Sequence, residues 1–583
     1  MPATKTMKTP KKQQAPDDQE TPRSFMRALF LGTFEEDMVH PYPVLPEEER
    51  ETLEMLLDSV RRFADASIDA RAIDEAEQMP KEVLEGMAEL GLFGVTIPEA
   101  YGGFGLSLAS YGQVMSELAA HCGSTAATIG AHLGIGSKGI VLFGTEEQKK
   151  RFLPGCASGE TIAAFCLTEP SSGSDAANIA ARAEHDAASG TWVLNGTKQW
   201  ITNGGIADVF TVFVQTETEG TAKQAVKKER AMTAFILTRG MEGLATGRPE
   251  KKMGLRGSST TDVVMQNVRV PEANMLGERG HGFKIAMEIL NTGRLSLAAA
   301  CAGPSRALIA RSAEFAKGRR AFDHTIADFE MIKSKFAEMA LDTYALEATV
   351  AVTTAMATRG WDFSLESALC KIQASEAMWR TVNHAVQING GFGYMREYPY
   401  ERTLRDARIN PIFEGTNEIL RMFVALAGAQ GPGRMLKEVG KALGEPLAGL
   451  GVLGDYAARR IRRAMGKEKL DFVPEPLRES AALVERQAAE FASTVEAMLR
   501  KHGRTIVERE YLLERVADAA VDLFAMACCL SRASAAGTDE DHLMARAFCA
   551  RAWRRVRRNL RQIDSNDDAD TTAVADTILG SGA

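Results

Sequence analysis

One carboxylate in the chain stands in a setting that suits proton transfer. In the segment 411–420, Glu414 lies between Phe413 and Gly415, and Thr416 has the character of an N-cap for a following helix. An apolar neighbour desolvates a carboxyl group and raises its pKa toward neutrality, which is what a general base needs. The alternative is an ordinary loop glutamate that the positive end of the helix dipole stabilises.

Three further segments suit a flat, polar ligand, and each also has a plain structural interpretation. Residues 165–175 predict a strand that ends in a hydroxyl-rich loop, which either binds a polar group or caps a turn. Within residues 198–205, Trp200 and Thr202 suit ring stacking with one hydrogen bond, or they pack in a simple hairpin. The clustered glycines of residues 387–394 let backbone approach a ligand closely, or they end a helix.

The elements that must position these residues follow from length and pattern. The 583 residues predict three to four domains, and the pattern is helical, then β-rich, then helical again, which indicates separate α and β domains in an α+β, mainly α fold. The boundaries expected are a disordered tail and N-terminal arm over 1–46, a helical domain over 47–163, a β domain over 164–280, a helical domain over 281–430 and an extra helical domain over 431–583. The sequence carries neither a GxGxxG after a strand nor a P-loop motif.

Composition excludes several classes of protein. Hydrophobic residues make up 45% and charged residues 25% of the chain, which is typical of a globular protein and not of a disordered or collagen-like one. The net charge of -8 gives no case for nucleic-acid binding. No uninterrupted run of apolar residues is long enough to span a membrane, so no membrane helix is predicted. The eight scattered cysteines indicate reduced thiols, with no metal site and no disulfide framework.

Taken together, the motifs resemble the acyl-CoA dehydrogenase family. LTEPSSGSD, QWITNGG, LNTGR, INGGFGY, RDARI and FEGTNEIL occur in the family's order between about residues 47 and 430. The C-terminal segment that contains IVEREYLLERVADAAVDLF is similar to the very-long-chain branch of that family. The resemblance implies a β-barrel-like middle domain and a four-helix bundle after it. It also implies FAD-dependent conversion of a long- or very-long-chain acyl-CoA to a trans-2-enoyl-CoA, with electrons passed to an electron-transfer flavoprotein.

The resemblance also assigns roles to individual residues. Glu414 takes the position of the catalytic base, because the position that other branches use, just before the Arg of LNTGR, is Gly293 here. Arg294 is expected on the thioester side of the substrate, or in a buried ion pair that orients Glu414. The expected FAD-binding residues are Phe165, Leu167, Thr168, Ser174, Trp200, Ile201, Thr202, Arg319, Gln387, Gly390, Gly391, Thr416, Asn417 and Glu418, and the expected acyl-CoA-binding residues are Ser174, Asn291, Arg294 and Gly415.

Two features bear on substrate length and on membranes. Gly130, Gly134 and Gly136 lie in an expected helix, where glycine is unfavourable, so they either make room for an acyl tail or allow close helix packing. Residues 448–466 predict a basic amphipathic helix with Arg459, Arg460, Arg462 and Arg463, which either lies on an anionic membrane or is a solvated helix with a packed stripe.

The remaining expectations concern partners and place. We expect a homodimer, because the segment 319–323 is similar to one that carries an Arg across a subunit boundary to FAD, although Asp323 replaces the usual Gly there. If the source is a bacterium, the expected location is the cytoplasm, with peripheral contact at the inner membrane as an option. The mitochondrial matrix is the less favoured alternative, because residues 1–24 resemble no clear transit peptide. Two alternatives stay open: an acyl-CoA oxidase that reduces oxygen, and a family scaffold with an assembly role.

Overall fold

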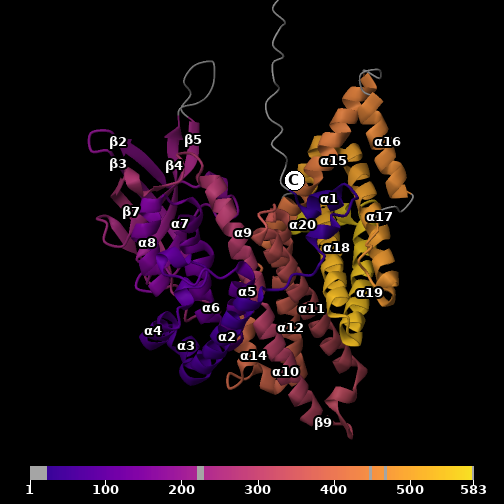
Figure 1. Ribbon diagram of the computed structural model, residues 1–583, viewed down its shortest axis with the longest axis horizontal. Helices are drawn as coiled ribbons and strands as arrows, with labels where there is room; N and C mark the ends of the chain where they lie inside the picture. The colour runs from indigo at the N-terminus through magenta and orange to yellow at the C-terminus, as the bar shows by residue number, and fades with distance from the viewer. Residues whose placement is uncertain (1–22, 219–228, 445–449, 465–468, 581–583) are drawn as a thin grey trace, which may run out of the picture.

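The structure is a computed structural model that describes residues 23–218, 229–444, 450–464 and 469–580. The expected disordered tail over residues 1–22 lies outside these ranges. Helical, β and helical parts follow one another as predicted, with a second helical part beside the first C-terminal one (Figure 1).

The N-terminal part is helical because its apolar residues recur every three or four positions. In α2 (Glu47–Ser67) these are Leu53, Leu57, Val60 and Ala64, all buried. The rest of this part consists of α3 Ala70–Ala76, α4 Lys81–Glu89, α5 Leu108–His121, α6 Gly123–Ile129, the π-helical segment η4 Gly130–Gly136, α7 Lys138–Phe143 and α8 Glu146–Ser158.

The middle part is one eight-stranded sheet. Seven strands follow the order β6-β7-β3-β2-β4-β5-β8, and β1 pairs in parallel with β4. The strands are β1 Ala163–Cys166, β2 Arg182–Asp186, β3 Thr191–Thr202, β4 Val209–Thr218, β5 Glu229–Thr238, β6 Leu244–Thr246, β7 Thr260–Pro271 and β8 Met275–Leu276. Alternate side chains such as Trp192 and Leu194 of β3 and Phe210 and Val212 of β4 fill one shared core, as the barrel-like prediction requires.

The C-terminal bundle places long helices side by side. It contains α9 Gly282–Ala300, α10 Ala302–Gly318, α11 Glu330–Thr358 and α12 Ser364–Asn389, followed by α13 Gly391–Tyr394, α14 Pro399–Ala407 and α15 Asn417–Gly444. Between α10 and α11, β9 Arg320–Ala321 and β10 His324–Thr325 form a small hairpin. The turn of this hairpin holds Phe322 and Asp323 at φ of 52° and 64°, and Asp tolerates this left-handed region in place of the expected Gly.

The expected domain boundary at residue 430 falls inside a helix. α15 continues through Gly431 and Pro432, so the Gly-Pro-Gly segment is not a linker. A Cβ atom on Gly428 would lie 2.4 Å from the ring of Phe30. The small residues in this part of α15 therefore make room for the N-terminal arm, which the sequence pattern did not reveal.

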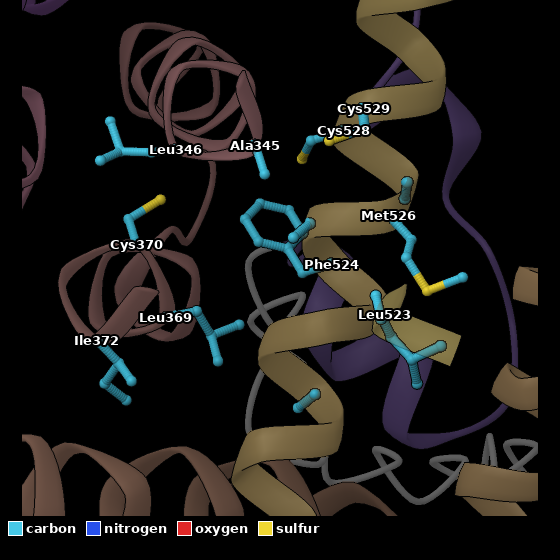
Figure 2. Close-up of a cluster of buried hydrophobic side chains, with 14 of the residues drawn as sticks. Ala345, Leu346, Leu369, Cys370, Ile372, Leu523, Phe524, Met526, Cys528 and Cys529 are labelled. Atoms are coloured by element: carbon cyan, nitrogen blue, oxygen red, sulfur yellow. The ribbon is translucent and has the colours of Figure 1, made fainter. Parts of the chain in front are cut away.

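The extra helical part shares its core with the bundle. It comprises α16 Leu450–Ala464, α17 Arg478–His502, α18 Glu510–Ala536, α19 Asp539–Arg561 and α20 Asp568–Leu579. Figure 2 shows Phe524 of α18 pointing toward Ala345 of α11 and Leu369 of α12. The N-terminal arm, with α1 Phe25–Phe30, packs into the same cluster, where the ring centroids of Phe25 and Phe524 are 5.8 Å apart.

Among the described residues, two helical stretches are long and apolar enough to cross a membrane, Gly123–Phe143 and Glu510–Ala536. No membrane helix was predicted from the sequence, because neither stretch is an uninterrupted apolar run. Both stretches are mostly buried inside the protein, as core helices are.

Candidate active site

Glu414 lies in a tight bend between α14 and α15. Its φ of 58° is left-handed, and Gly415 follows at φ 88°, so the chain reverses sharply before the helix. The Thr416 hydroxyl accepts a hydrogen bond from the Ile419 N–H at 3.3 Å, which confirms the predicted N-cap. A left-handed conformation is unfavourable for a residue with a side chain, and such strain concentrates at functional sites.

One oxygen of the Glu414 carboxyl group is shut away from water. Its Oε2 atom is buried and has no hydrogen-bond partner within the described residues, although other parts of the residue are half-buried. Burial raises the pKa of Glu414 to about 7, while the charges of Arg294 and Lys371 act to lower it. A Cβ on Gly293 would lie 2.9 Å from Oε2, so the position that serves as base in other branches faces the same carboxyl group.

Arg294 and Asn291 of α9 hold the bend through its main chain. The Arg294 Nε donates to the Glu414 carbonyl oxygen at 3.2 Å, and its Nη1 donates to the Asn291 Oδ1 at 2.9 Å. In the described ranges, Arg294 forms no ion pair with the Glu414 carboxylate. The alternative of an ion pair between Arg294 and the Glu414 carboxylate is therefore wrong. Arg294 instead positions the loop through its hydrogen bond to the Glu414 carbonyl oxygen.

On the opposite side, a bulge in β3 presents Trp200. The pairing of β3 with β7 shifts register between Lys198 and Ile201, and Trp200 takes a φ of 57° there. The indole is 60% exposed, which is unusual for so large an apolar side chain. The Gln199 N–H donates to the Thr168 carbonyl oxygen at 2.8 Å and so ties the bulge to the loop after β1.

A buried ion pair that the sequence analysis missed fixes this loop. The Lys198 Nζ lies 2.6 Å from the Glu169 Oε1 and 3.1 Å from the Leu167 carbonyl oxygen, and both charged side chains are buried. Glu169 also accepts a hydrogen bond from the Ala181 N–H at 3.0 Å. The pair joins β3, the loop after β1 and the start of β2, so it positions both Thr168 and Trp200.

One cavity of about 1330 Å³ connects the two sides. It brings together seven residues that the sequence predicted, Thr168, Ser174, Trp200, Thr202, Glu414, Gly415 and Thr416. Phe165, Leu167 and Ile201 are buried and are not among the residues that line this cavity. An exposed indole face, hydroxyl groups and an unpartnered carboxyl oxygen around one cavity fit a flat heteroaromatic cofactor beside a substrate.

Other predicted residues lie outside the cavity wall. The Asn417 side chain is buried against α12, where its Nδ2 donates to the Ser375 Oγ at 3.0 Å, and Glu418 is exposed. Arg319, Gln387, Gly390 and Gly391 are also exposed, on the bundle side of the molecule. Within the single chain, these four residues line no part of the cavity.

The glycines of η4 were expected either to make room for an acyl tail or to allow close packing, and both roles occur. Gly130 lines the cavity, and a Cβ on it would lie 3.2 Å from the terminal methyl of Met115. A Cβ on Gly136 would lie 2.8 Å from the backbone of Ala163 in β1, so this glycine permits close packing. Gly134 faces the Tyr111 hydroxyl at 3.5 Å.

Comparison with known proteins adds to this geometry. Family models for the acyl-CoA dehydrogenase N-terminal, middle and C-terminal domains match residues 50–160, 164–268 and 280–428, and the ACAD9/ACADV C-terminal domain model matches residues 475–582. The chain is 42% identical to the human very long-chain specific acyl-CoA dehydrogenase, over 93% of this chain and 85% of the human one. The chain belongs to the acyl-CoA dehydrogenase family.

Solved structures of this family have the same fold. An acyl-CoA dehydrogenase from Bacillus anthracis, complexed with FAD, covers 94% of both chains with a TM-score of 0.76 and 32% identity. The butyryl-CoA dehydrogenase of Megasphaera elsdenii covers 66% of this chain and 99% of its own, with a TM-score of 0.61 and 36% identity. The family and branch predicted from the motifs are thus confirmed.

Proposed function

We propose that this acyl-CoA dehydrogenase uses FAD to convert long- or very-long-chain acyl-CoA to trans-2-enoyl-CoA and passes the electrons to an electron-transfer flavoprotein. The observation that carries the proposal is the desolvated, unpartnered carboxyl group of Glu414 in the cavity that Trp200 also lines. A carboxyl group with a raised pKa binds a proton more strongly than an ordinary glutamate, as removal of a weakly acidic proton requires.

Each residue has a stated task in this proposal. Glu414 accepts the proton from the α-carbon, and its main-chain N–H stabilises the charge that develops on the thioester oxygen. Arg294 holds the bend in place, and Gly415 and Ser174 contact the substrate. When bound, FAD supplies the acceptor for the β-hydride. Trp200 would hold the flat ring of FAD through its exposed indole, and Thr168 and Thr202 would hold it through their hydroxyl groups.

The acyl chain is proposed to run past α9 and η4. The small side chains of Gly130, Ala131, Gly293 and Ser296 line this part of the cavity. Small residues leave space, and burial of each methylene group contributes about 0.8 kcal/mol, so a deeper pocket favours a longer chain.

A second copy of the chain is proposed to complete the FAD site. Arg319, Gln387, Gly390 and Gly391 are exposed, and their distance from the cavity wall of their own chain suits contact with the partner's FAD. Gel filtration with light scattering would measure the oligomeric state. A monomer that retains FAD would contradict this part of the proposal.

Peripheral membrane contact is proposed through α16, in the cytoplasm of a bacterial cell. Val452, Arg459, Arg460 and Ile461 are exposed on this helix, as an interfacial helix requires. Arg463 is turned inward instead, where its Nη1 lies 3.2 Å from the Glu496 Oε2, so it does not belong to the exposed face. Residues 448, 449, 465 and 466 of the expected helix lie outside the described residues. Sedimentation with anionic vesicles tests the contact.

The proposed dehydrogenation is tested by the loss of flavin absorbance (bleaching) when palmitoyl-CoA is added in the absence of oxygen. We expect Glu414→Gln to bind FAD but not bleach it. Glu366→Gln is a matched control, because Glu366 is also buried with a pKa raised to about 7 but contacts Ser24 of the arm. Bleaching of Glu414→Gln at the normal rate would show that the base is elsewhere. Hydrogen peroxide as the main product in air would favour an oxidase, and a purified protein that is colourless and takes up no FAD would favour a scaffold.

A further inference from the structure

A buried lysine of the bundle points at the bend that carries Glu414. Lys371 lies in α12 between Cys370 and Ile372, and its side chain is fully buried. Its Nζ donates to the Gly415 carbonyl oxygen and to the Asn417 Oδ1, each at 2.8 Å. One side chain therefore clamps the two ends of the turn that follows Glu414.

The surroundings of Lys371 leave its charge without a direct ionic partner. Both acceptors are neutral oxygens, and no carboxylate of the described chain lies within ion-pair distance of the Nζ. Burial lowers the pKa of Lys371 to about 7, and the Glu414 charge is the largest influence that acts to raise it. Burying an ammonium group is unfavourable unless an opposite charge compensates for it, and Glu414 is the nearest candidate.

We propose that Lys371 is the positioning residue of Glu414: it fixes the left-handed bend through Gly415 and Asn417, and its charge favours the ionised carboxylate in the cavity. This inference rests on the proposed function and adds a residue to it. Arg294 restrains the Glu414 carbonyl from α9, whereas Lys371 restrains the following residues from α12. The bend is thus held from two helices at once.

Other charged or titratable groups around the pair set the background. Arg294 of α9 opposes the charge of Lys371 and favours an ionised Glu414, and Glu418 of α15 favours a charged Lys371. Tyr111 of α5 feels the Glu414 charge, and burial holds the pKa of its hydroxyl above the usual range. Removal of Lys371 leaves these groups in place, so its own effect is measurable.

The test compares Lys371→Met and Lys371→Gln with wild type. Infrared titration of the apoprotein follows the carboxyl band of Glu414 and so reports the protonation of this group directly. The band is assigned by its absence from the spectrum of Glu414→Gln. Without the lysine charge, which acts to lower the pKa of Glu414, we expect the titration midpoint of this carboxyl group to rise by about one pH unit, because a nearby opposite charge lowers a carboxyl pKa by about 1 to 3. Below neutral pH, bleaching by palmitoyl-CoA should then slow about tenfold.

The two variants separate charge from position. Lys371→Gln keeps an N–H donor, so we expect its rate of flavin bleaching at alkaline pH to approach that of wild type. The midpoint of the Glu414 titration in this variant should nevertheless stay raised, because the positive charge is gone. Lys371→Met should stay slower than Lys371→Gln at alkaline pH. Arg380→Met is a matched control on the same helix, because the Arg380 guanidinium binds Asp342 at 2.7 Å, away from the bend. The midpoint of the Glu414 titration in this control should equal that of wild type.

The outcomes distinguish this inference from the proposed function. If Glu414→Gln still bleaches, the base assignment fails and this inference fails with it. If Glu414→Gln is inactive but both Lys371 variants titrate and react like Arg380→Met, only the role of Lys371 is overturned. Should Lys371→Met fail to fold, the midpoint of Lys371→Gln alone decides the question.

Discussion

Filling the space above Gly130 should shorten the acyl chain that the enzyme accepts. Gly130 has an ordinary helical backbone, with φ -61° and ψ -42°, so a larger residue fits there without backbone strain. A Cβ would meet only the flexible end of Met115 at 3.2 Å and the Ser296 hydroxyl at 3.8 Å. Gly130→Leu therefore projects its side chain into the cavity, and we expect the protein to fold.

The size of the effect follows from the methylene groups that the new side chain displaces. A leucine side chain takes the place of about three acyl carbons, each worth about 0.8 kcal/mol when buried, or roughly 2–3 kcal/mol in total. For a chain that fills the whole pocket, kcat/KM should fall roughly 30- to 150-fold. For a short chain that ends before η4, it should stay within about twofold.

The assay measures kcat/KM with a series of substrates from octanoyl-CoA to eicosanoyl-CoA. The reference variant is Gly440→Leu, on the exposed surface of α15, where a Cβ would meet nothing within 4 Å. We expect the optimum of Gly130→Leu to move to shorter chains and that of Gly440→Leu to stay unchanged. An unchanged chain-length profile in a folded Gly130→Leu protein would show that the acyl chain does not pass η4.

Three further predictions concern charges. Because the pKa of Glu414 is raised to about 7 and the base acts when ionised, the bleaching rate should rise as pH increases through about 7, as stopped-flow measurements across pH would show. Glu169→Gln leaves the buried Lys198 uncompensated and should destabilise the protein by about 3–5 kcal/mol in urea unfolding, whereas Glu169→Leu with Lys198→Met should recover much of this loss. Burial also raises the pKa of Glu366, from 4.5 to about 7, so its contribution to arm docking is fully present below pH 4.5 and should be lost as pH rises from there to about 7. Proteolysis of the arm should therefore quicken as pH rises toward neutrality, and level off above it, in wild type but not in Glu366→Gln.

The order and kind of the elements could be predicted where an element such as α2 or β3 is amphipathic along its own length. The spacing of Leu53, Leu57 and Val60 gives α2 whatever lies around it, and the alternation in β3 gives a strand. The boundary expected at residue 430 lies inside α15, which continues through Gly431 and Pro432 although glycine and proline usually interrupt a helix. Here Gly428 packs directly against Phe30, a residue almost four hundred positions earlier in the chain. A contact between residues so far apart cannot be predicted from the local sequence around either of them.

The candidate site divides in the same way. Residue types and their order identified Glu414, Trp200, Thr202 and the family, because the chemistry requires those groups in those motifs. Lys371 was missed although a single charge inside the apolar run 369–372 is a signal for a buried lysine.

Only the tertiary structure decided how these groups act together. The pKa of a carboxyl group depends on how much water and which charges surround it, and those come from α9 and α12, which are far from Glu414 in sequence. The same holds for the bulge that exposes Trp200, since it depends on β7 and on the Lys198–Glu169 pair. Sequence fixes which atoms are available, whereas desolvation and Coulomb interactions depend on distances that only folding sets.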